Sequence, residues 1–105
     1  MFSFYKVTGD SMEPTITSGS YVFAFKKLDY NVNDIVVVNI TKDLKIIKRI
    51  ISINNHKIKL SGDNNTKSSS LCEPWYLKKQ VESKIIFNFS FIDRFLKTKE
   101  PSHIS

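Results

Sequence analysis

The sequence has few of the residues that cross-link a small fold or bind a metal ion. Its 105 residues include one cysteine, Cys72, and two histidines, His56 and His103. One cysteine cannot form an internal disulfide, and no Cys, His or carboxylate group has the spacing of metal ligands. We therefore expect no metal and no other cofactor. Because neither histidine has a partner pattern, a Ser-His triad is disfavoured.

Glycine and long apolar runs are also scarce. With three glycines there is no glycine-rich phosphate loop. The longest apolar tract, residues 85–92, is interrupted by Asn88 and Ser90, and nothing approaches the ~18 residues that span a bilayer. No basic segment followed by an apolar one opens the chain. We expect a cytoplasmic or membrane-peripheral protein of one domain, since 41% hydrophobic residues suffice for a small core.

The net charge of +6 is concentrated near the end of the chain. Residues 78–99 contain six basic and two acidic residues, a net +4, together with Phe87, Phe89, Phe91 and Phe95. Such a basic, Phe-rich segment could contact a membrane surface as a peripheral partner. The alternation of the phenylalanines fits a half-buried strand equally well, and we favour the strand. We expect no nucleic-acid partner, and the oligomeric state stays open.

Short β-branched and aromatic runs separated by turn residues predict a mainly β fold. The expected strands cover residues 2–7, 21–25, 34–40, 44–53, 57–60 and 81–91, and residues 61–70 form a polar loop. Such strands with close turns indicate a compact sandwich or a partly open barrel. We expect one catalytic domain over residues 1–91 and a short helix or tail over residues 92–105.

Lys48 and Ser11 are the candidate catalytic residues. Side chains two apart share one face of a strand, so Lys48 lies in a row with Leu44, Ile46 and Ile50. Burial in an apolar row favours the neutral amine, which is the form that a general base needs. Ser11 stands in a turn between Gly9 and Pro14, where its hydroxyl could project. A serine with a lysine base is a known variant of the catalytic triad.

These segments resemble a known family. In order, the chain contains G-D-S-M-x-P-T-I-x-x-G from residue 9, D-I-V-V-V from residue 34, I-K-R-I from residue 47 and G-D-N-x-x-x-S from residue 62. This set resembles the type I signal peptidases and, more broadly, the Ser-Lys peptidase clan that includes the LexA-like self-cleaving repressors. Over about residues 5–70, the resemblance implies a catalytic domain of the signal peptidase and LexA-like type, with Ser11 as nucleophile and Lys48 as base.

The same resemblance implies supporting residues. Gly62, Asp63 and Asn64 form the third motif, and Ser68 is expected to hydrogen-bond the lysine. Met12, Ile16 and the strand containing Tyr5 and Val7 are candidate walls of a substrate pocket. The main-chain N–H of Ser11 is expected to help bind the oxyanion.

The chain also departs from the family pattern. Gly9 stands where some relatives carry a second oxyanion donor, a serine hydroxyl. Residues 70–72 read Ser-Leu-Cys where relatives continue with Asp-Ser-Arg, so the acidic–basic pair of that motif is expected to be missing. The usual membrane anchor does not precede Ser11 in this sequence, so we expect either that an anchor lies outside these 105 residues or that the chain is one of the short soluble members. The short layout is similar to that of nickel superoxide dismutase maturation proteases.

The favoured hypothesis is a signal-peptidase-like serine endopeptidase that cleaves a precursor protein or leader peptide after small residues. Its partner is then a protein or peptide substrate. One alternative is a LexA-like self-cleaving or mutagenesis-type domain, although no helix-turn-helix or cleavable linker precedes Ser11. A second alternative is a catalytically silent β module that only binds partners.

Overall fold

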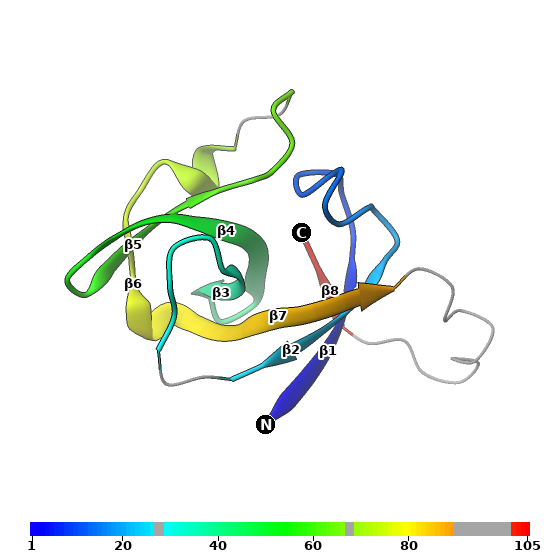
Figure 1. Cartoon of the computed structure of the whole chain (residues 1–105), viewed down its shortest axis with the longest axis horizontal. Helices are drawn as coiled ribbons and strands as arrows, with labels where there is room; N and C mark the ends of the chain where they lie inside the picture. The colour runs from blue at the N-terminus through cyan, green and yellow to red at the C-terminus, as the bar shows by residue number, and fades with distance from the viewer. Residues whose placement is uncertain (27–28, 67–68, 90–101) are drawn as a thin grey trace.

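The computed structural model describes residues 1–26, 29–66, 69–89 and 102–105. Within these residues, eight strands form one mixed sheet in the order β6-β5-β4-β3-β7-β2-β1-β8, which coils without closing into a barrel (Figure 1). The strands are β1 Phe2–Val7, β2 Tyr21–Phe25, β3 Ile35–Thr41, β4 Leu44–Asn54, β5 Lys57–Ser61, β6 Tyr76–Leu77, β7 Val81–Phe89 and β8 Ser102–Ile104. The expectation of a mainly β, partly open fold is confirmed.

The strands predicted from the sequence agree with the structure to within one or two residues at their described ends. β7 follows the strand expected over 81–91 as far as Phe89, and residues 90–91 lie outside the described part. Three short elements between residues 70 and 80 were not predicted: η1 Ser70–Cys72, β6 and η2 Lys78–Gln80. Of the segment expected as a helix or tail, residues 92–101 lie outside the described part and Ser102–Ile104 form β8. The domain division at residue 91 stays a prediction.

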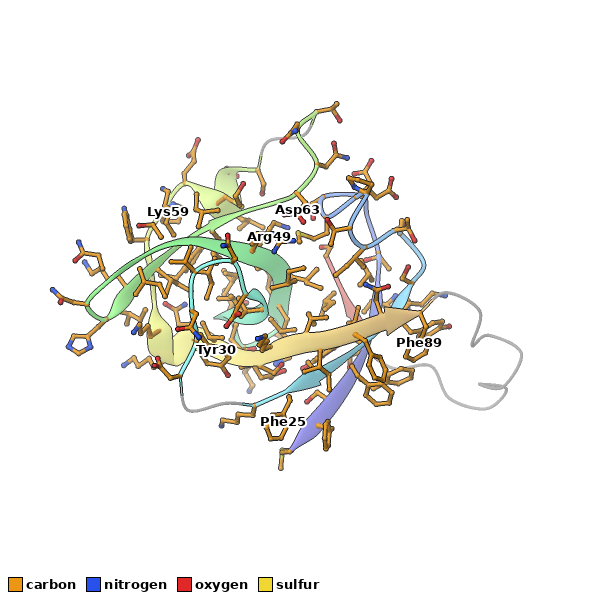
Figure 2. The ribbon with its side chains drawn as sticks, in the orientation of Figure 1. Phe25, Tyr30, Arg49, Lys59, Asp63 and Phe89 are labelled. Carbon is orange, nitrogen blue, oxygen red and sulfur yellow. The ribbon has the colours of Figure 1, made fainter. Side chains whose placement is uncertain are left out.

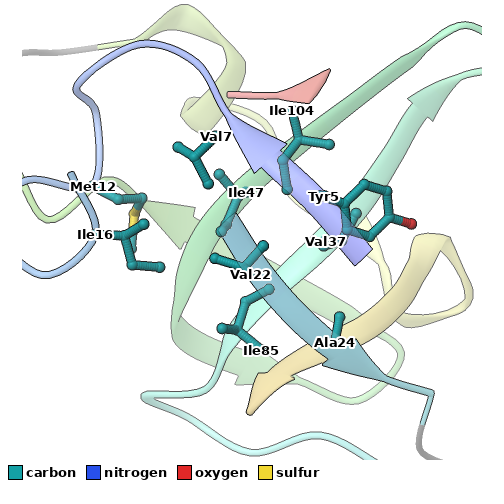
Figure 3. Packing of buried hydrophobic residues seen from close by; sticks show 10 residues of the cluster. All are labelled: Tyr5, Val7, Met12, Ile16, Val22, Ala24, Val37, Ile47, Ile85 and Ile104. Atoms are coloured by element: carbon teal, nitrogen blue, oxygen red, sulfur yellow. The ribbon is translucent and has the colours of Figure 1, made fainter. Parts of the chain in front are cut away.

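Two hydrophobic clusters lie on opposite faces of the coiled sheet. The first, shown in Figure 3, comprises Tyr5, Val7, Met12, Ile16, Val22, Ala24, Val37, Ile47, Ile85 and Ile104. The second comprises Tyr30, Val36, Val38, Ile46, Ile50, Ile58, Leu60, Tyr76 and Val81. Consecutive residues of β4, such as Ile46 and Ile47, therefore enter different clusters. The middle of β4, from Ile46 to Ile50, is covered on both faces, which leaves little water around the side chains buried there.

The aromatic residues of β1, β2 and β7 stack in neighbouring rows. Phe23 lies 4.9 Å from Phe4 and 5.6 Å from Phe87, between ring centroids. Phe87 and Phe2 nevertheless stay largely exposed at the edge of this face. In the described residues no helix has the length and apolarity to cross a membrane. A membrane-surface contact at this end of the chain stays untested.

Arg49 of β4 is paired with Asp63 in the loop after β5. Its Nε and Nη2 donate to the two carboxylate oxygens at 2.8 and 2.6 Å, and Figure 2 shows the two side chains together. Thr15 Oγ1 also donates to Asp63, at 2.6 Å. The guanidinium lowers the pKa of Asp63 below 3.8 by hydrogen bonding to its charged form. The bidentate pair with Arg49 anchors the loop to β4, and the bond from Thr15 anchors it to the turn that contains Thr15.

We predict that Asp63→Asn lowers the free energy of unfolding by about 1–2 kcal/mol, because the amide cannot accept two charge-assisted bonds. Thermal or urea unfolding at pH 7 measures the loss. Asp29→Asn is the matched control, since Asp29 forms an exposed pair with Lys78 at 3.8 Å, and it should change stability by less than about 0.5 kcal/mol.

The pH dependence of this difference has a defined sign. A carboxyl with a lowered folded pKa stabilises the fold above its unfolded value, and the contribution is lost as pH falls through the folded pKa. The difference between wild type and Asp63→Asn should therefore shrink below pH 3.8. Equal losses in Asp63→Asn and Asp29→Asn at pH 7 would contradict the anchoring role.

Candidate active site

Ser11 lies in the turn that follows β1. Gly9 adopts φ +87°, a conformation that side chains with a Cβ rarely adopt, and it turns the chain away from the strand. Asn64, in the loop after β5, holds this turn through two hydrogen bonds. Its N–H donates to Ser11 O and its Nδ2 to Asp10 O, both at 2.9 Å. The motif containing Ser11 and the motif containing Asn64 are therefore in direct contact.

Lys48 reaches Ser11 from the central strand β4. Its Nζ lies 2.9 Å from Ser11 Oγ, within hydrogen-bond distance. The side chain is only 3% exposed, between Ile46 and Ile50 along the strand and opposite Val36 on β3. The buried apolar row predicted from the sequence is thus present for these three residues, whereas Leu44 at its start is exposed.

Burial lowers the pKa of Lys48 below 10.5, because the ammonium loses hydration that its neighbours only partly replace. Cys72, through the negative charge of its thiolate form, opposes this shift and raises the pKa of Lys48 by a smaller amount. A lowered pKa increases the fraction of neutral amine near physiological pH. A neutral amine accepts the hydroxyl proton of Ser11, which is what a general base beside a serine nucleophile must do.

Gly62 lies against the turn so closely that no side chain fits. A Cβ built on it would be 2.6 Å from Ser11 O, well inside van der Waals contact with a main-chain atom. Gly62, Asp63 and Asn64 each have a separate role in this contact: Gly62 allows the approach, Asn64 hydrogen-bonds the turn, and Asp63 binds Arg49.

The ion pair of Asp63 bears on the expectation drawn from residues 70–72. Residues 70–72 are Ser-Leu-Cys in place of the usual Asp-Ser-Arg. An acidic–basic pair nevertheless holds the loop, with the carboxylate from Asp63 and the guanidinium from Arg49 of β4. No role was expected for Arg49 from the sequence. The partner could not be identified from spacing, since the two residues meet only when β5 folds back beside β4.

A cleft of about 560 Å³ opens above Ser11 and Lys48. Gly62 and Ser61 form part of its wall, and residues from η1 and its flanks complete it: Ser69, Leu71, Cys72 and Glu73. Cys72, to which the sequence gave no role, therefore borders the cleft. Nothing in the sequence pattern indicated this position, because it depends on η1 folding over the end of β5.

Four predicted substrate-contacting residues lie in the first hydrophobic cluster. Tyr5, Val7, Met12 and Ile16 are each at most 5% exposed, and none of them lines the cleft. Their contact with a substrate stays a prediction. Ser68, expected to orient the lysine, lies outside the described residues, and its role also stays a prediction.

A further contact in the site was not expected from the sequence. Ser105, which follows β8, lines the cleft, and its main-chain oxygen accepts a hydrogen bond from Lys48 Nζ at 2.9 Å. No sequence signal indicated this contact, which joins residues 57 positions apart. Across the described residues, no three His, Cys, Asp or Glu side chains gather as they would around a metal ion.

A comparison with known protein families gives a match over most of the chain. The protein-family model described as Peptidase S24-like matches residues 2–86, which include Ser11, Lys48 and the third motif. A search of curated proteins gives no match. The match fits the resemblance to the Ser-Lys peptidase clan and leaves the branch within it open. Because the matched range covers most of the chain, the protein belongs to the Peptidase S24-like family, whose members are peptidase-type domains.

Proposed function

We propose that this protein is a serine endopeptidase in which Ser11 is the nucleophile and Lys48 the general base. The observation that carries the proposal is the 2.9 Å approach of Lys48 Nζ to Ser11 Oγ on a lysine that is almost completely buried. An ordinary surface lysine would keep its charge in water. The family match and the adjoining cleft support the same conclusion.

The proposed reaction has two halves. Ser11 Oγ attacks a peptide carbonyl as its proton passes to Lys48 Nζ, and Nζ then gives this proton to the departing amine. A water molecule next loses a proton to Nζ and attacks the acyl-enzyme ester, which releases the acid and restores Ser11. The main-chain N–H of Ser11 would stabilise the oxyanion, and Gly9 contributes no hydroxyl for it.

The proposed substrate is a precursor protein or leader peptide cleaved after a small residue, as in signal peptidases. An extended peptide can add main-chain hydrogen bonds at a strand edge while its side chains enter alternate pockets. The preference for small residues comes from the family resemblance. Strands β4 and β5 contribute Lys48, Lys59 and Ser61 to the lining of the cleft.

A serine-reactive acylating probe and intact-mass measurement separate this proposal from its alternatives. A peptidase acting on other chains incorporates one probe at Ser11 and cleaves added peptide. A self-cleaving domain loses mass at a rate independent of its own concentration. A silent β module incorporates no probe in wild type beyond the level in Ser11→Ala.

We predict that Ser11→Ala and Lys48→Met each reduce kcat/KM by roughly 10⁴-fold, and that the double variant is little worse, because residues acting as one unit give non-additive losses. Peptide cleavage measures the rates, and thermal unfolding checks the fold. Ser18→Ala in the same turn and Lys45→Met on the same strand are the controls and should keep near-full activity. Additive losses would count against a Ser11–Lys48 unit.

The rate should rise with pH as Lys48 loses its proton. Because burial lowers the pKa of Lys48, the acidic limb of kcat/KM should have its midpoint below pH 10.5. Cys72→Ser removes the thiol whose thiolate form raises the pKa of Lys48, so the limb should move to lower pH. Lys45→Met should leave it in place. A limb near pH 10.5 would contradict a buried base.

The same shift adds a stability test. Between the lowered pKa and 10.5, the unfolded chain binds more protons at Lys48 than the folded chain does. The free energy of unfolding therefore rises with pH across this window. Lys48→Met should remove that rise, and its persistence in the variant would assign it to another group.

Gly62→Ala should displace the nucleophile. Its Cβ would require Ser11 O to shift, and a misplacement of about 1 Å at a catalytic group can cost roughly 10²-fold in rate. Gly19→Ala is the control, because Gly19 has φ +88° but no atom within 4 Å of the added Cβ. It should lower stability by about 1–2 kcal/mol through backbone strain and leave kcat/KM unchanged. Wild-type kcat/KM in Gly62→Ala would refute the positioning role.

A further inference from the structure

The strand β8 occupies the outer edge of β1, beside the nucleophile turn. It runs parallel to β1, with Ser102 opposite Tyr5 and Ile104 opposite Val7. The pairing continues past the strands, because Thr8 N–H donates to Ile104 O at 2.8 Å. In Figure 1 the end marked C lies between β4 and the turn that follows β1. A peptide that approached Ser11 along β1 would need the same edge.

Ser105, which follows β8, contacts Lys48 beside Ser11. Lys48 Nζ donates to the main-chain oxygen of Ser105 at 2.9 Å and lies the same distance from Ser11 Oγ. A peptide carbonyl awaiting attack by Ser11 must stand within a few ångströms of that hydroxyl. The Ser105 main chain is therefore placed where the reacting part of a substrate has to lie.

One side chain of the segment, that of Ile104, is buried as an anchoring side chain of a bound peptide would be. Ile104 is 2% exposed and belongs to the first hydrophobic cluster with Tyr5, Val7 and Met12 (Figure 3), whereas Ser102 and His103 are exposed. The residues named from the sequence as substrate walls thus share one cluster with an aliphatic side chain of the segment, and Val7 lies directly opposite it on β1. The family match ends at residue 86, so β8 lies beyond the part of the chain that the family model covers.

We propose that the edge of β1 is a binding groove for an extended peptide, and that residues 102–105 are its built-in occupant, which closes the Ser11–Lys48 site to other peptides. The peptide class that fits has an aliphatic residue in the Ile104 position followed by a small residue at Ser105. The binding groove stands on the pairing and burial above. Its inhibitory consequence rests on the proposed function.

Residues 102–105 would lower the rate according to the fraction of molecules in which they fill the groove. The apparent activity of a protein scales with the fraction of molecules in the competent state. If the groove were open in about one molecule in ten, release of the segment would raise kcat/KM about tenfold. The Lys48 hydrogen bond to Ser105 adds to this effect, because it engages the base as a donor.

Ile104→Asp in the full chain tests the proposal, because a carboxylate is costly in an apolar cluster and a strand at the sheet edge can detach. Ile51→Asp is the matched control, since it makes the same change at an exposed position of β4. Hydrogen exchange read by NMR reports release at the Thr8 amide. The Val7 amide, which donates to Ser20 O at 2.8 Å, reports whether the rest of β1 stays folded.

We expect Thr8 exchange to accelerate at least about tenfold in Ile104→Asp while Val7 stays protected. Peptide cleavage and probe acylation of Ser11 should both rise several-fold, and Ile51→Asp should match wild type in all three. Release at Thr8 without a rise in activity would overturn the inhibitory role. Unchanged Thr8 exchange would overturn the occupancy itself. Ile104→Ala, a milder change, should give the same order of effects if Ile104→Asp loses Val7 protection.

A peptide supplied from outside tests the groove without catalysis. In the Ser11→Ala, Ile104→Asp double variant, acetyl-Ser-His-Ile-Ser should restore Thr8 protection in a saturable manner, and acetyl-Ser-His-Asp-Ser should not. This readout separates the two proposals. Restored protection together with no peptide cleavage by the Ile104→Asp single variant would refute the peptidase and keep the groove. An active enzyme without restored protection would refute the groove and keep the peptidase.

Discussion

The burial of one amine in the centre of the sheet is the constraint on which the rest of the site depends. Lys48 stands on β4 between Ile46 and Ile50, where both faces of the strand are covered. An ammonium in this position loses hydration worth several kcal/mol. Lys48 therefore lowers the stability of the fold relative to an apolar residue at the same position. The cost is offset in function, because the same desolvation lowers the pKa of Lys48. Stability and reactivity at this position therefore oppose each other.

A buried base is useful only if its partner is held still. Ser11 lies on a turn, and turns are among the more mobile parts of a protein. Here the turn is held by Gly62, which permits close contact, and by Asn64, which donates hydrogen bonds to the consecutive carbonyl oxygens of Asp10 and Ser11. The pair of Arg49 and Asp63 links that support back to β4. The nucleophile and the base are thus positioned from the same strand, by residues 48 and 49.

The sequence predicted those features that depend on local pattern. The alternation along β4 identified Lys48 as buried, and the turn residues around Ser11 placed it after a strand; both need only neighbours in sequence. The partner of Asp63, the position of Cys72 and the strand β8 were not predictable in this way. Ile104 bonds to Thr8, 96 residues earlier, and a three-residue strand has too little pattern to be read alone. Such contacts form only when the coiled sheet brings segments that are distant in the sequence together.

The groove and the base are coupled through water. Ser105 is one of the groups that covers Lys48 Nζ, and it lies on a segment at the edge of the sheet. When that edge is empty, water reaches the amine and its charged form is stabilised. When an extended peptide fills the edge, water is excluded and electrostatic interactions inside the site strengthen. We infer that filling the groove favours the neutral base, so that a bound substrate strand would complete the environment that Lys48 needs. The internal segment provides the same cover, and this is how one groove can serve both inhibition and catalysis.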